Sequence, residues 1–219
     1  MLNELQQRFR ITFRKGADVR LISHLDLARA WERALRRADV ALAYSHGFSP
    51  HPRMFFASAL PVGTTGRAEM LDIVVERPIG LSDLTARLRG QMPAGLEVTG
   101  LAEVPLTLPS LPAQVVAAEY EVLVGCTDAP AALQERLEGL LATGSLPRRL
   151  ERDGKPREYD LRPLIQRLWL IGRRHDDCLI GMRLQADAQG TGRPGEVMAA
   201  LGLHADVRAI ARTQLLFKA

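Results

Sequence analysis

The period with which apolar and polar residues alternate changes along the chain, and these changes predict the elements of its first half. Residues 8–13 alternate basic and apolar side chains, which predicts a strand with one covered face. From Ser23 the apolar residues recur at helical spacing, and Asp26 stands three residues on in a near capping box. Strands at 54–60, 68–76 and 96–104 and a helix at 81–91 follow. The predicted order, β-α-β-β-α-β, is that of a ferredoxin-like domain.

A related order of elements is predicted beyond a proline-rich segment at 105–112. Three prolines among leucines favour neither a regular helix nor a central strand, so this segment is interpreted as an extended linker. After it we expect strands at 118–125, 146–152, 164–172, 178–185 and 207–216, helices at 129–142 and 194–201, and a turn at 154–157. The predicted fold class is α+β, with two ferredoxin-like units in tandem and antiparallel sheets. The domains are 1–104 and 114–219, joined by a linker at 105–113, and the second carries an extra hairpin.

Composition narrows the class of protein. The chain has 219 residues, 47% of them hydrophobic, and no apolar run long enough to span a bilayer. The polar, basic N-terminus has no secretory signal, so we expect a cytoplasmic protein. Cys126 and Cys178 form no CxxC or CxxxCxxC spacing, so they predict neither a zinc site nor an iron-sulfur cluster. A possible metal site would use His24, His46 and His51 with Glu69, but these residues lack the spacing of usual metal ligands. No metal or cofactor is therefore predicted.

Positive charge is concentrated in residues 8–67. Eleven Lys and Arg stand there against four Asp and Glu, which gives this segment a charge of +7 within a chain of net charge +4. Nearly all of the basic residues are arginine, which suits bidentate contacts with phosphate and stacking on bases. The alternative is a solvated, charged helix face with no ligand. The charge therefore favours an anionic partner without naming a reaction.

The candidate functional residues lie mostly in this basic half. His24, in the first turn of the first helix, is a candidate general acid or base for a phosphodiester, or an ordinary residue of a capping turn. Two prolines stiffen the loop after Tyr44 and fix how His51 is presented, as in a binding site or in any tight loop. A late glycine-rich segment, 190–195, precedes a helix and suits a phosphate or a plain turn. The predicted substrate-binding residues are Lys15, Arg29, Arg33, Arg36, Tyr44, His51, Arg53 and Arg193.

Several motifs together resemble one known family. They are Lys15-Gly16, 22–27 (ISHLDL), 33–38 (RALRRA), Tyr44-Ser45, 47–52 (GFSPHP), 60–63 (LPVG), 158–165 (EYDLRPLI), 193–197 (RPGEV) and 211–213 (ART). They resemble the uncharacterised radical-SAM-linked family, a domain of unknown function fused to the C-terminal side of cobalamin-binding-type radical SAM proteins or encoded beside them. Ser49 stands where asparagine is expected, and Thr65-Gly66 where a small polar pair is expected. The resemblance implies a radical SAM protein as partner. Without a CxxxCxxC motif, this chain is not itself the radical enzyme.

Three functions fit these observations. The favoured one is an accessory module without assigned activity that binds an anionic substrate, such as structured RNA, through its basic N-terminal half. The second is a metal-independent endoribonuclease that uses His24, similar in element order to the CRISPR repeat-processing endoribonucleases. The third is a scaffold in which the arginine stripe meets an acidic protein surface. The sequence favours a binding module over an enzyme.

Overall fold

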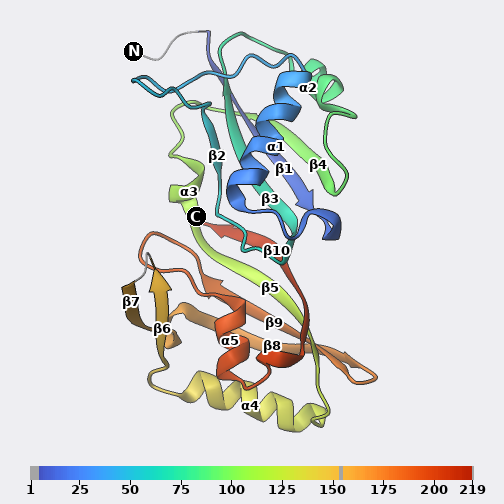
Figure 1. Cartoon of the computed structure of the whole chain (residues 1–219), viewed down its shortest axis with the longest axis vertical. Coiled ribbons are helices and arrows are strands. Elements are labelled where there is room, and N and C mark those ends of the chain that lie inside the picture. Colours follow the sequence, from blue (N-terminus) through green and yellow to red (C-terminus); the bar gives the residue numbers. More distant parts are fainter. Residues whose placement is uncertain (1–4, 153–154, 219) are drawn as a thin grey trace. The chain divides into compact units, whose positions relative to one another are not determined.

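A computed structural model describes residues 5–152 and 155–218, and the chain divides into two compact units (Figure 1). Unit 1 is Met1–Val115 and unit 2 is Val116–Ala219. Both units combine a mostly antiparallel sheet with a few helices, so the predicted α+β class is confirmed. Among the described residues, no helix has both the length and the apolar character needed to cross a membrane.

Unit 1 is built on a sheet with the strand order β4-β1-β3, and β2 also pairs with β3. All three pairings are antiparallel. A 3-10 turn at Ala17–Val19 precedes the first helix. The elements are β1 (Gln7–Lys15), α1 (His24–Arg37), β2 (Met54–Phe56), β3 (Thr64–Val75), α2 (Leu81–Leu88), β4 (Leu96–Val104) and α3 (Leu111–Gln114).

Alternation along β1 sends its apolar side chains into the core of unit 1. Phe9 and Ile11 are fully buried, and their partners on β3 are the buried Ile73 and Leu71. The predicted apolar stripe of α1 packs on this face, with the ring of Trp31 edge-on to Phe13 at a centroid distance of 5.0 Å. The predicted cap is also confirmed, because the Ser23 hydroxyl accepts a hydrogen bond from the backbone N–H of Asp26 at 3.1 Å.

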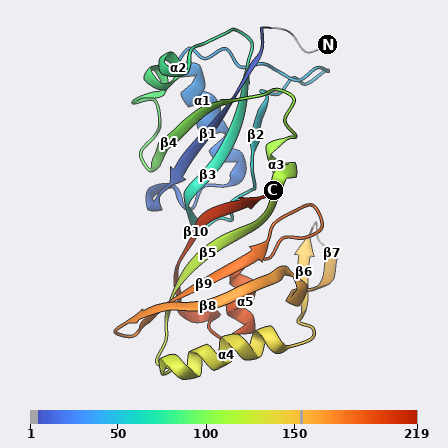
Figure 2. The same ribbon diagram turned by 180° about the vertical axis from the view of Figure 1, so that it is seen from behind.

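Unit 2 has a sheet with the strand order β10-β5-β9-β8, and its β5–β9 and β8–β9 pairs are antiparallel. A separate two-stranded ribbon, β6-β7, stands apart from this sheet. The elements are β5 (Val115–Gly125), α4 (Pro130–Ala142), β6 (Pro147–Arg152), β7 (Lys155–Asp160), β8 (Ile165–Arg174), β9 (Asp177–Gln185), α5 (Pro194–Ala200) and β10 (Val207–Phe217). In Figure 2 the strands β8 and β9 lie in front of α5, so the helices cover one face of this sheet.

Several segments differ from the sequence prediction, and the strand predicted at 54–60 ends at Phe56. The turn predicted at 154–157 is wrong beyond residue 154, because Lys155 already begins β7 and pairs with Arg152. Pairing with the neighbouring strand, rather than an alternating pattern, makes this segment a strand. The predicted extended linker contains the helical turn α3, in which Pro112 occupies the first turn, where a proline costs no hydrogen bond. Leu111 of that turn is fully buried.

Candidate nucleic-acid interface

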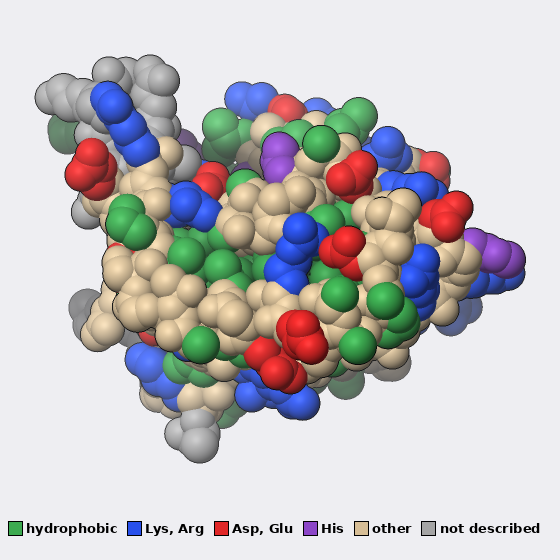
Figure 3. All heavy atoms as spheres, turned by 90° about the horizontal axis from the view of Figure 1, so that it is seen from below, with side chains coloured by type: hydrophobic (Ala, Val, Ile, Leu, Met, Phe, Trp, Pro, Cys, Tyr) green, Lys and Arg blue, Asp and Glu red, His purple; other side chains and the backbone are tan. Residues whose placement is uncertain are grey.

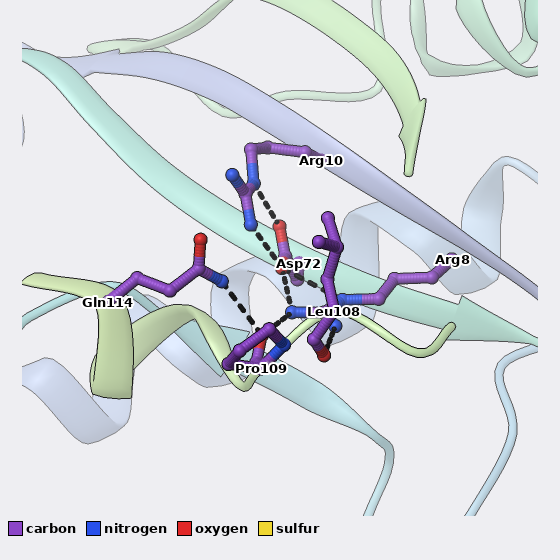
Figure 4. A network of polar contacts seen from close by, with 6 residues as sticks. All are labelled: Arg8, Arg10, Asp72, Leu108, Pro109 and Gln114. Carbon is purple, nitrogen blue, oxygen red and sulfur yellow. Dashed lines mark hydrogen bonds and ion pairs between the residues drawn. The ribbon is translucent and has the colours of Figure 1, made fainter. Parts of the chain in front are cut away.

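The two inner arginines of β1 are used by the fold. Arg8 and Arg10 both bind the carboxylate of Asp72 on β3, each with its Nε at 2.9 Å from a carboxylate oxygen (Figure 4). Asp72 is fully buried and Arg8 nearly so. Arg8 also donates to the carbonyl oxygens of Leu108 at 2.8 Å and Pro109 at 3.0 Å, which ties the segment before α3 to the sheet. Arg8 is therefore enclosed in unit 1, and Arg10 is held half-buried beside it.

Lys15, a predicted substrate-binding residue, is 1% exposed. Its Nζ donates to the carbonyl oxygens of Arg20 at 3.1 Å and Thr64 at 3.4 Å, which joins the loop before α1 to the start of β3. The carboxylate of Glu69 is buried in the same corner. A Cβ on Gly66, the partner of Lys15 on β3, would lie 2.6 Å from Glu69 Oε1, so only glycine leaves room for this side chain. Lys15 therefore lies beneath the surface, where it holds the segment before α1 against the start of β3.

The arginines on the outer face of α1 are exposed, but they differ in their partners. Arg29 pairs with Asp26 at 3.2 Å and Arg36 pairs with Glu32 at 3.1 Å, both within the helix. Arg33 lies between them, and within the described residues no carboxylate lies at ion-pair distance from it. Arg33 is consequently the cation of this stripe that is most available to an outside anion.

His24, the predicted catalytic residue, is the first residue of α1 and is half-buried. Its ring meets the ring of Phe56 edge-on, with centroids 5.0 Å apart. Asp26 is occupied elsewhere, because its carboxylate accepts from the Ser23 hydroxyl at 2.7 Å and from Arg29. The Ser23 hydrogen bond, followed by the Arg29 contact, holds the pKa of Asp26 below its usual range. Asp26 therefore stabilises the start of the helix, and its carboxylate does not orient the His24 ring.

The loop from Tyr44 to Arg53 is closed at its base by backbone contacts. Tyr44 and Pro52 form an antiparallel bridge, and the N–H of Ser45 donates to the carbonyl oxygen of His51 at 2.8 Å. The Ser45 hydroxyl in turn accepts from the N–H of His51 at 3.0 Å. The loop therefore presents its tip from a defined base, as its two prolines predict.

This loop exposes aromatic side chains at its tip and at its base. Phe48 is fully exposed and Tyr44 is 45% exposed, while His46 and His51 are also exposed. Gly47 has φ of +127°, a conformation that favours glycine and turns the chain immediately before Phe48. The backbone contacts at the base of the loop place Tyr44 close to His51, and the loop also exposes Phe48, which the sequence analysis missed. Its signal was an apolar residue between the turn-forming Gly47 and Pro50.

The remaining predicted binding residues, Arg53 and Arg193, are not part of this tip. Arg53 is half-buried and donates through Nη1 to the side-chain oxygen of Gln6 at 2.9 Å. Arg193 is exposed at the start of α5, in unit 2.

In the glycine-rich segment before Arg193, backbone N–H groups donate to acceptors of this chain. The carboxylate of Asp187 accepts from the N–H groups of Gln189 at 2.8 Å and Gly190 at 3.2 Å. These bonds contribute to a pKa of Asp187 below its usual range, after the larger contribution of the Gln185 side chain. Gly192 N–H donates to the carbonyl oxygen of Gln185 at 2.9 Å. These N–H groups are therefore satisfied without a phosphate.

Neither the histidines nor the cysteines form a metal site in the described part of the chain, where no group of three or more His, Cys, Asp and Glu is placed to hold an ion. Cys126 and Cys178 are buried, reduced neighbours at one end of the β5–β9 pair. Burial, followed by the adjacent Cys126, raises the pKa of Cys178. A buried thiol with a raised pKa is a poor nucleophile.

On the face drawn in Figure 3, Lys and Arg side chains are interspersed with Asp and Glu, so this face shows no basic track.

Comparison with known families places the chain. A family model described as "Uncharacterized protein conserved in bacteria (DUF2344)" matches residues 8–194. This protein belongs to the DUF2344 family. The description of DUF2344 names no activity, substrate or partner, and it makes no reference to radical SAM proteins. No curated protein matches this DUF2344 chain.

Two solved structures resemble the DUF2344 chain at low identity. A structure described as "Crystal Structure of a Cbf5-Nop10-Gar1 Complex" is similar at 12% identity and a TM-score of 0.48, over 95% of this chain and 48% of the other. A second, "Structure of H/ACA RNP bound to a substrate RNA containing 2'-deoxyuridine", is similar at 11% identity and a TM-score of 0.46, over 94% of this chain and 47% of the other. The DUF2344 chain spans about half the length of each. Likenesses at this level assign no function.

Proposed function

We propose that this DUF2344 protein is an RNA-binding module, and that its RNA surface in unit 1 combines the outer face of α1 with the tip of the 44–53 loop. The observation that carries the proposal is the fully exposed Phe48, on a loop that is closed by hydrogen bonds and that also exposes Tyr44, His46 and His51. An exposed aromatic ring costs free energy in water, and it can stack on any unpaired base. A short segment, 38–43, joins this loop to the end of α1.

The arginines of α1 support the proposal because one of them, Arg33, has no carboxylate partner in the described chain. Arg29 and Arg36 are partly neutralised by carboxylates of their own helix, while Arg33 is exposed without one in the described chain. Phosphate contacts from such a stripe position an RNA without reading its sequence, and base stacking at the loop tip adds contacts that a duplex cannot make. We therefore expect binding to an RNA stem-loop rather than to a plain duplex.

Charge reversal on α1 tests this proposal. The ligand is a fluorescein-labelled RNA stem-loop, and binding is measured by fluorescence anisotropy at several salt concentrations. We expect the double variant Arg33→Glu, Arg36→Glu to bind at least about tenfold more weakly and to reduce the slope of log K against log salt by about two. Phe48→Ser should weaken binding and leave the salt slope unchanged, because stacking releases no counterions.

The matched control is Arg77→Glu, Arg89→Glu, which makes the same change of charge at two other exposed positions of unit 1. This control should bind RNA like the wild-type protein. If the α1 variant binds as tightly as wild type at matched salt, or if the control loses as much affinity, the proposed surface is wrong. Circular dichroism of each variant checks that the fold is intact.

The nuclease alternative has less support. Asp26 does not orient His24, and the His24 ring is half-buried against Phe56. His24→Ala separates the two functions, because a nuclease would lose cleavage and keep binding, whereas a binding module has no cleavage to lose.

One observation favours the scaffold alternative. Leu21, Leu25 and Val62 are exposed apolar side chains, and their segments are joined by a hydrogen bond from Gly63 N–H to the Arg20 carbonyl oxygen at 2.8 Å. Purification of the tagged protein from its own cells, with identification of RNA and proteins in the eluate, distinguishes a scaffold from an RNA-binding module. The radical SAM partner implied by the resemblance and the cytoplasmic location stay predictions that this purification also addresses.

We also infer that the two units are ferredoxin-like domains in tandem, with the predicted domains 1–104 and 114–219. Strand order supports this inference. In unit 1 the four strands lie in the order 4-1-3-2 when they are numbered along the chain. With the β6-β7 ribbon set aside, β5, β8, β9 and β10 of unit 2 also lie in the order 4-1-3-2. Production of each predicted domain alone tests whether it folds cooperatively.

A further inference from the structure

The sheet of unit 2 has one face that its helices do not cover. On the helix side, Val122 of β5 and its partner Ile180 of β9 are fully buried. Figure 2 looks at the opposite face, where β8 and β9 lie in front of α5. Because side chains alternate along a strand, Glu119, Trp169, Gly181 and Arg183 lie on this second face.

Three residues form a stack on the open face. Trp169 of β8 is directly opposite Gly181 of β9, and a Cβ on Gly181 would lie 2.1 Å from the Cε2 atom of the Trp169 ring. The ring therefore rests on the backbone of β9, at a place where only glycine admits it. The guanidinium of Arg167 lies over this ring, with its Cζ 4.9 Å from the ring centroid. The result is a half-buried aromatic ring and an exposed planar cation on this face of the sheet.

The charged side chains around this stack differ in their partners. Its partner across β8 and β9 is Arg183, which places two cations side by side. Arg183 is neutralised, since it pairs with Glu119 at 2.7 Å, and the second oxygen of Glu119 accepts from Gln214 at 2.7 Å. In the described part of the chain, no carboxylate lies at ion-pair distance from Arg167. The surface therefore offers a ligand an exposed planar cation that is backed by the Trp169 ring.

We propose that the Arg167–Trp169 stack binds single-stranded RNA, with one base stacked on this pair and an adjacent phosphate bound by Arg167. A base has the planar π-face that matches the ring and the guanidinium, and its phosphate supplies the missing anion. An acidic peptide would supply the charge but not the planar group. Bases inside a duplex expose no face, so the ligand is single-stranded. The inference rests on the proposed function only in taking RNA as the ligand, and it uses residues of unit 2 alone.

Tryptophan fluorescence tests this site directly. The chain has two tryptophans, and Trp31 is fully buried in the core of unit 1, so a change on ligand addition reports on Trp169. A single-stranded uridine decamer is titrated into the full-length protein. We expect quenching in the wild-type protein, loss of the quenching in Trp169→Phe, and at least about tenfold weaker binding in Arg167→Glu. Arg89→Glu, with the same change of charge on an exposed residue of unit 1, should titrate like wild type.

The outcomes separate this inference from the proposed function. If the decamer binds without quenching, or if Arg167→Glu binds it like wild type, the Arg167–Trp169 site is wrong and the α1 surface still stands on its own test. Suppose that the decamer quenches the wild-type protein as expected, but that Arg33→Glu, Arg36→Glu binds the stem-loop like wild type. The site in unit 2 then stands, and the proposed surface in unit 1 is wrong. If the wild-type protein binds neither RNA, both are wrong, and a protein ligand for these surfaces replaces them.

Discussion

Arg8 and Arg10 of β1 are close in sequence to the arginines of α1, but the structure gives them different surroundings. Arg8 and Arg10 converge on the single buried carboxylate of Asp72, whereas Arg29 and Arg36 make exposed pairs with carboxylates of their own helix. The β1 network joins three segments that are distant in sequence. The same residue type therefore stabilises the fold in one place and remains available for a ligand in the other.

The physical reason for the difference is desolvation. A guanidinium that loses its water must recover the lost interactions from carboxylates and carbonyl oxygens, and Arg8 does so with Asp72, Leu108 and Pro109. An exposed guanidinium keeps its water, so its ion pair adds little and is easily exchanged for a phosphate. A count of basic residues along the sequence cannot distinguish these two cases.

The largest effect on stability should come from removing the shared carboxylate. Asp72→Asn keeps the shape of the side chain but leaves two guanidinium groups in a largely dehydrated site without an anion. We expect the free energy of unfolding to fall by about 3–5 kcal/mol. Urea denaturation followed by circular dichroism measures this change. A loss of less than about 1 kcal/mol would mean that Asp72 is not the centre of a buried network.

A smaller effect is expected from Arg8→Met, which removes one cation and leaves the other pair in place. Asp72 keeps Arg10, but the carbonyl oxygens of Leu108 and Pro109 lose their donor. We expect a loss of about 2 kcal/mol. Because these carbonyls hold the segment before α3, amide hydrogen exchange should increase first in residues 105–114. Unchanged exchange in this segment, with stability lowered elsewhere, would contradict the assigned role of Arg8.

The same contrast shows what the sequence could predict. The capping of α1 by Ser23 and its apolar stripe were predicted correctly, because both depend on residues close in sequence. The burial of Lys15, the convergence on Asp72 and the stack of Trp169 on Gly181 were not predictable, because each depends on strand partners that are fixed only by the sheet. The sequence predicted a loop at 44–53 that is stiffened by its prolines, but neither its closure by hydrogen bonds nor the full exposure of Phe48.

The smallest effect should come from the exposed pair of α1, and pH reveals it best. The pKa of Asp26 lies below its ordinary value of 3.8, chiefly because of the Ser23 hydroxyl and then Arg29. A carboxyl with a lowered pKa in the folded state stabilises the protein above its unfolded-state pKa, and this contribution is lost as pH falls through the folded-state value. Asp26→Asn should therefore flatten the fall of the melting temperature below about pH 4, with little change near pH 7.

Added salt should weaken the contribution of this exposed pair and leave that of the buried Asp72 network almost unchanged, since screening acts mainly on charges in contact with solvent. Equal salt sensitivity of Asp26→Asn and Asp72→Asn, each measured against wild type, would remove the distinction between the two arginine regions.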